Sequence, residues 1–134
     1  ISHDKGKSAG FEGKTISQLA PNRQFWDVWR DNRGKISDDE NNKYYIEEYY
    51  KQILLKANIE ELLKDEESPI LLCYEKEGEF CHRHIVAEYI EYKYGIKVRD
   101  IKIDENLNIT ECERPIYIKT FLLDAIKKEQ GIEK

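Results

Sequence analysis

The chain contains 134 residues, which is the size of one domain with a modest hydrophobic core. Its hydrophobic content of 40% and its charged content of 37%, with both signs interspersed, argue against disorder and indicate helices with solvated faces. The net charge is −5 and Lys and Arg form no basic block, so nucleic acid is not expected as a partner. A small anionic ligand stays compatible with this charge, because one arginine and one helix end suffice to bind a phosphate.

Residues 1–20 are predicted to be a flexible glycine-rich loop, because Gly6, Gly10 and Gly13 interrupt a segment without apolar periodicity. The tripeptide Gly6-Lys7-Ser8 resembles part of a phosphate-binding loop, but it lacks the required upstream glycine. The chain begins at Ile1 and contains no methionine. We therefore expect a truncated N-terminus on a single domain over residues 1–134. Two clear strands are also few for a sheet, which indicates that its first strands are missing.

Three helices are predicted in the first half of the chain. The first begins at Pro21-Asn22 and ends at Arg33-Gly34. The second begins near Asp38, whose charge complements the helix dipole, and runs to Leu54 with tyrosines on one broad buried face. Asn58 and Glu61 resemble a capping box, which predicts a short helix over Ile59–Leu63.

The second half predicts a strand–helix–strand unit. Ile70–Tyr74 is a continuous apolar run, as expected for a strand buried on both faces, and a helix follows over Cys81–Tyr94 and stops at Gly95. Ile96–Ile103 alternates as a second strand, which the connecting helix would make parallel to the first. A brief edge strand over Leu107–Ile109 and a last helix from Pro115 to Gly131 complete an α/β fold.

The turn between the first strand and its helix concentrates the reactive side chains. Cys73 ends the strand, and Cys81, His82 and Arg83 open the helix, where free N–H groups favour negative charge. Cys81 is the best candidate for a reactive thiolate, because a helix N-terminus and a neighbouring arginine both lower the pKa of a thiol. Arg83 offers a planar fork to an anion, and His82 is suited to carry a proton near neutral pH.

Two alternatives to a reactive thiol remain open at this turn. Cys73, Cys81, His82 and His84 are ligand types that zinc prefers, but their spacing fits no standard zinc pattern, so we assign no metal site and no cofactor. Cysteine is also among the most buried residue types, so the same residues are compatible with simple packing. The nine residues between Cys73 and Arg83 depart from the five-residue spacing of cysteine phosphatases.

The composition also predicts where in the cell the protein is found and whether it associates with a membrane. Three cysteines in a chain rich in Lys and Glu do not resemble a secreted disulfide framework, which favours the cytoplasm. No apolar run approaches the roughly 20 residues needed to span a bilayer, so no membrane association is expected. The sequence gives no indication of the oligomeric state.

The segments Leu71–Lys76 and Glu79–Glu88 together resemble the signature of the bacterial and archaeal family known as domain of unknown function 488. The likeness extends over roughly Ile1–Ile103. It implies a small three-layer αβα (Rossmann-like) domain with a mostly parallel sheet, with Cys73 and Cys81 near the carboxyl edge. The family often has an arginine at the position of His3. The resemblance implies no reaction, and so it leaves open whether the protein is an enzyme.

The residues and the resemblance together predict a cysteine-dependent enzyme or binder of a small anionic or nucleotide-like ligand. Cys81, His82 and Cys73 are the candidate catalytic residues. Arg83, Glu75 and His3 are the candidate substrate-binding residues. The alternative is a non-catalytic module that binds nucleic acid or a protein and uses the cysteine and histidine cluster structurally or for a metal.

Overall fold

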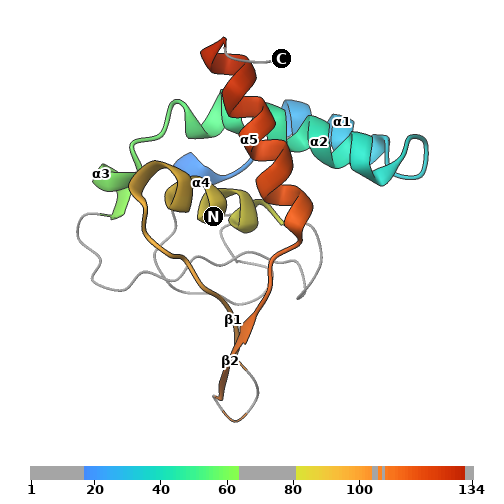
Figure 1. Cartoon of the computed structure of the whole chain (residues 1–134). Helices are drawn as coiled ribbons and strands as arrows, with labels where there is room; N and C mark the ends of the chain where they lie inside the picture. The colour runs from blue at the N-terminus through green and yellow to red at the C-terminus, as the bar shows by residue number, and fades with distance from the viewer. Residues whose placement is uncertain (1–16, 64–80, 104–105, 107, 132–134) are drawn as a thin grey trace.

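The computed structural model of the chain describes residues 17–63, 81–103, 106 and 108–131. Within these residues the structure is mostly helical, and a two-stranded hairpin projects away from the helices (Figure 1). In chain order the elements are η2 (Ser17–Leu19), α1 (Arg23–Asp31), α2 (Asp38–Tyr49), η3 (Tyr50–Leu54), α3 (Ile59–Leu63), α4 (His82–Tyr94), β1 (Asp100–Ile103), β2 (Ile109–Cys112) and α5 (Ile116–Gln130). The first of these is a 3-10 helix and η3 is a π-helix.

Short polar side chains cap the first turns of the first three α-helices, at Asn22 and Asn58 as predicted and also at Ser37. Asn22 Oδ1 accepts a hydrogen bond from Gln24 N at 2.7 Å at the start of α1. Asn58 Oδ1 accepts one from Glu61 N at 3.1 Å, which confirms the cap predicted for α3. The cap of α2 is Ser37, whose Oγ accepts from a backbone N–H at 3.1 Å. Each cap satisfies one of the free donors in the first turn.

The long helix predicted from residue 38 to residue 54 is real, but its last five residues form a π-turn. Leu55 N donates to Tyr50 O at 3.0 Å, which is the five-residue spacing of a π-helix. Both Tyr50 and Leu54 are buried at this turn. Periodicity alone predicted only a helix here, because apolar residues four apart fit either form.

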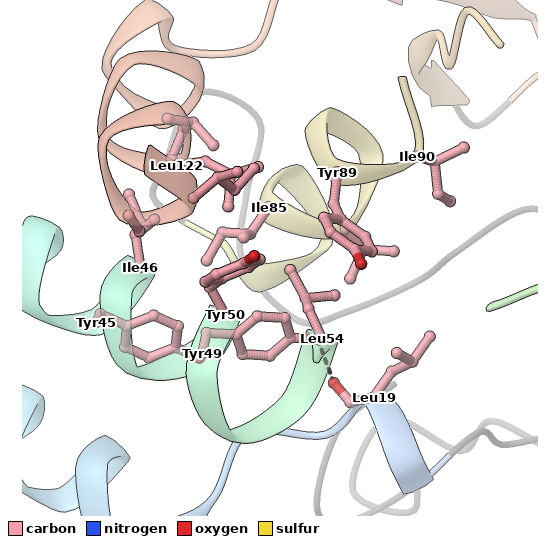
Figure 2. Close-up of a cluster of buried hydrophobic side chains, with 14 of the residues drawn as sticks. Leu19, Tyr45, Ile46, Tyr49, Tyr50, Leu54, Ile85, Tyr89, Ile90 and Leu122 are labelled. Atoms are coloured by element: carbon pink, nitrogen blue, oxygen red, sulfur yellow. Dashed lines mark hydrogen bonds between the residues drawn. The ribbon is translucent and has the colours of Figure 1, made fainter. Parts of the chain in front are cut away.

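The core gathers around α2, which contacts α1, α4 and α5. The rings of Tyr45 and Tyr49 stack with centroids 6.2 Å apart, and Phe25 meets Tyr45 edge-on at 5.2 Å. Figure 2 shows the Tyr49 ring extending toward Leu19, whose carbonyl accepts a hydrogen bond from the Tyr49 hydroxyl at 2.5 Å. Residues 1–20 were predicted to be loop; where the structure describes them, η2 delivers Leu19 into this core.

The sheet within the described residues differs from the prediction. It has two strands, and β1 pairs with β2 antiparallel, with Asp100 opposite Cys112. This arrangement supports a mixed α/β fold but not the three-layer Rossmann-like domain with a mostly parallel sheet. The strand predicted over Ile70–Tyr74 lies outside the described residues.

The strand expected from Ile96 begins only at Asp100. The backbone of Val98 is bound by side chains instead of by a neighbouring strand. Its N–H donates to Glu91 Oε2 at 2.8 Å, and its carbonyl accepts from Arg114 Nη1 at 2.6 Å. The second strand likewise starts later than predicted, at Ile109. None of the described helices has the length and apolar character needed to cross a membrane.

Candidate functional site at the start of helix α4

Helix α4 begins directly after Cys81, as the sequence predicts. Cys81 is the N-cap, with extended dihedral angles of φ −149° and ψ 139°, and its carbonyl accepts from His84 N at 3.0 Å. The first turn carries no acidic side chain, whereas α2 begins with three. The far end stops at Gly95, which adopts a left-handed conformation at φ +68°. The positive end of the helix dipole therefore coincides with a basic sequence.

The sulfur of Cys81 is buried and oxidised in this structure. Cys81 is 1% exposed, and its sulfur is disulfide-bonded, whereas the sulfur of Cys112 is not in a disulfide. A thiolate at position 81 therefore requires prior reduction of the disulfide. Three other predicted site residues, Cys73, Glu75 and His3, lie outside the described residues.

The two histidines of the first turn face different parts of the protein. His82 is 5% exposed, and its ring lies 5.9 Å from the ring of Tyr49 on α2 at an angle of 46°. His84 is 1% exposed and places Nε2 3.5 Å from Oδ2 of Asp100 on β1. Residues two apart on a helix diverge by about 200°, so the two imidazoles serve separate environments.

Arg83 lies beside the same carboxylate as His84. Its Nε is 3.4 Å from Asp100 Oδ1, and the Arg83 and Asp100 side chains are 16% and 11% exposed. One carboxylate oxygen of Asp100 thus lies near Arg83, and the other lies near His84. This pairing orients the guanidinium at the start of α4 and leaves part of it accessible to solvent.

Burial holds the His84 imidazole in its neutral form. The pKa of His84 is lowered to about 4, with burial as the largest cause, the Arg83 charge acting in the same direction, and the Asp100 carboxylate opposing both. Neither ring nitrogen has a hydrogen-bond partner among the residues that the structure describes, and the 3.5 Å approach to Asp100 is at the outer limit of such a bond. At neutral pH His84 is therefore an uncharged, poorly solvated ring.

Arg114 binds two carboxylates farther along α4. Its side chain is 10% exposed and donates from Nε to Glu88 Oε2 at 2.8 Å and from Nη2 to Glu91 Oε2 at 2.9 Å. Its Nη1 donates to the carbonyl of Val98, as described above. One guanidinium thereby ties α4 to the segment before β1 and to the residues preceding α5.

Sequence reasoning missed both Asp100 and Arg114. The alternating pattern over residues 96–103 included Asp100 but gave no reason to pair it with Arg83, which lies 17 positions earlier in the chain. The position of Arg114 immediately before a predicted helix was a weak signal, because a helix start disfavours a basic residue unless another group binds it.

The part of the chain that the structure describes contains no group of three or more His, Cys, Asp or Glu side chains suited to hold a metal ion.

A protein-family model, DUF488-N3a, described as the active DUF488-N3 subclade, matches residues 5–94. Comparisons with curated proteins and with solved structures gave no match. The matched region ends at Tyr94, the last residue of α4, and so includes the whole turn that carries Cys81, His82 and Arg83.

Proposed function

Because the chain belongs to the DUF488 family, we propose that it is a cysteine-dependent enzyme or binder acting on a small anionic or nucleotide-like ligand at the start of α4. The observation that carries this proposal is the order Cys81, His82, Arg83 at the positive end of a 13-residue helix without an acid in its first turn. Free N–H groups and the helix dipole both favour an anion at this position.

Each residue has a distinct role in the proposal. Arg83, oriented by Asp100, binds the anion through its planar guanidinium. Cys81, once reduced, supplies a thiolate that the helix dipole stabilises. His82 carries a proton to or from the ligand. Cys73 joins Cys81 and His82 as a candidate catalytic residue.

Glu75 and His3 complete the proposed ligand-binding set. The three-layer domain with a mostly parallel sheet, which would bring these residues to one sheet edge, is part of the proposal, as is a cytoplasmic location. A reducing compartment suits the mechanism, because only reduced Cys81 acts as a nucleophile.

The second candidate function is a non-catalytic binding module, and the burial of the cluster favours it. Cys81, His82 and His84 are each no more than 5% exposed. Residues sealed in this way commonly stabilise a core, and Cys and His together also suit a zinc ion. A nucleic-acid or protein partner would then bind elsewhere on the surface.

Thiol reactivity separates the two candidates. In a Cys73→Ser, Cys112→Ser background, Cys81 is the sole thiol, and its alkylation rate is measured between pH 5 and pH 10. The enzyme proposal predicts an apparent pKa well below about 8.5, the ordinary cysteine value. It also predicts that Arg83→Met raises this pKa.

An apparent pKa at or above the ordinary value, unchanged by Arg83→Met, would favour the non-catalytic module. Elemental analysis of protein purified without chelator then tests the metal form of that alternative. Stoichiometric zinc would support it, and substoichiometric metal would leave a purely structural cluster. A mobility-shift assay on a mixed oligonucleotide pool at low salt tests nucleic acid as the partner.

A further inference from the structure

A hollow of about 290 Å³ opens at the end of the long α2–η3 helix, and we propose that it binds a free α-amino acid with an aliphatic side chain. Its walls come from η2, η3, α3 and the residues that join the last two. The lining residues include Gln52, Ile53, Lys56, Ala57, Glu61 and Leu62. None of them belongs to the α4 site, so this inference is independent of the proposed function.

The π-turn of η3 shapes one wall of the hollow. Tyr50 and Leu54 are buried in the core at this turn, whereas Gln52 and Ile53 line the hollow. One further helical turn follows, with Ala57 N donating to Ile53 O at 3.0 Å. A π-turn is rare and costs regular helical bonding, and such turns occur frequently at functional sites.

The apolar part of the wall consists of Ile53, Ala57 and Leu62. All three are partly buried and pack against the hydrophobic core. Their side chains are ordered, because one side of each packs against that core. An aliphatic side chain of a ligand gains free energy by covering their remaining exposed area.

The polar part of the wall carries one charge of each sign. Lys56 is exposed and provides an ammonium group. Glu61 provides a carboxylate. Gln52 is held in place by the hydrogen bond from its Nε2 to Glu48 Oε1 at 2.7 Å.

A zwitterion matches this pair of charges, with its carboxylate toward Lys56 and its ammonium toward Glu61. The volume is slightly below the lower limit of about 300 Å³ for pockets that hold drug-sized molecules, so an amino acid is the appropriate size. A peptide or nucleotide would extend well beyond the hollow.

The test is a titration of the full chain with L-leucine, followed by nuclear magnetic resonance of the backbone amides of residues 52–62. Leucinamide, which lacks the carboxylate, and N-acetylleucine, which lacks the ammonium, serve as matched ligands. The variants are Lys56→Gln and Glu61→Gln, with Lys51→Gln and Glu60→Gln as controls. All four positions are exposed, so the variants are expected to fold.

We expect saturable shifts with L-leucine and a roughly two- to five-fold weaker affinity in each pocket variant, as for a solvent-reachable charge pair. Lys56→Gln should leave leucinamide binding unchanged, and Glu61→Gln should leave N-acetylleucine binding unchanged. The absence of saturable shifts at 20 mM leucine would overturn the proposal. Equal losses in the control variants, or pocket variants that lose no affinity, would overturn it as well.

Discussion

The stability of this protein should fall between pH 7 and pH 4 because of one buried side chain, His84. Its pKa in the folded state is about 4, whereas an unfolded histidine has a pKa of about 6.5. As the pH falls through 6.5, the unfolded chain takes up a proton at this position and the folded chain does not. A depressed pKa of this kind gives stability that is complete above 6.5 and is lost toward pH 4.

The size of the loss follows from the two pKa values. The difference of roughly 2.5 units corresponds to about 3 kcal/mol of unfolding free energy, at about 1.4 kcal/mol per unit. Most of it, about 2 kcal/mol, is already lost at pH 5. The structural cause is the burial of the ring, strengthened by the Arg83 charge and opposed by Asp100.

Urea unfolding at pH 7, 6, 5 and 4 measures this loss in the wild-type chain and in His84→Gln. The difference between the two chains isolates His84, because the carboxylates titrate in both. We expect the wild type to lose about 3 kcal/mol more than the variant over this range. A difference that stays constant with pH would refute the reasoning. A proton nuclear magnetic resonance titration of His84 in the folded wild type gives its pKa directly, should the variant fail to fold.

Three further predictions concern contacts that hold the helices together. Arg114→Met should lower the unfolding free energy by about 3 kcal/mol, because it leaves Glu88 and Glu91 without their shared cation. Tyr49→Phe should cost about 2 kcal/mol, because it leaves the buried carbonyl of Leu19 without its donor. Ser37→Ala should cost about 1 kcal/mol through loss of the α2 cap, and Ser37→Asp should retain the cap. Urea unfolding at pH 7 measures all three.

Each of these changes has its own control. Arg114→Lys keeps the charge but loses the fork, so its cost should lie between those of the wild type and Arg114→Met. A loss below 1 kcal/mol in Arg114→Met would show that the network contributes little. Unchanged stability in Tyr49→Phe would show that water replaces the hydroxyl. For Ser37, equal destabilisation by alanine and aspartate would remove the capping argument.

The helices were predictable because their signals are local. Asn22 and Asn58 begin α1 and α3 where a side-chain acceptor reaches a backbone donor two or three residues ahead. Gly95 ends α4, since a left-handed turn at φ +68° costs glycine little. Such interactions involve neighbours in the sequence, so their pattern is visible without the fold.

The strands and the ion pairs were not predictable in the same way. The strand that begins at Asp100 is delayed because Glu91 and Arg114 take the backbone groups of Val98. The pairing of Asp100 with Arg83 joins residues 17 positions apart, and that of Arg114 with Glu88 joins residues 26 apart. A sequence lists the charges, but only the packed chain selects which of them meet.

The sequence by itself determined that Cys81, His82 and Arg83 stand in order at the start of a helix, because capping and periodicity act over a few residues. The tertiary structure decided what each of them faces. Packing against α2 turned His82 toward Tyr49, and the position of β1 brought Asp100 to Arg83 and His84. The reason is physical: burial and ion pairing depend on distances between elements, which the folded chain alone establishes.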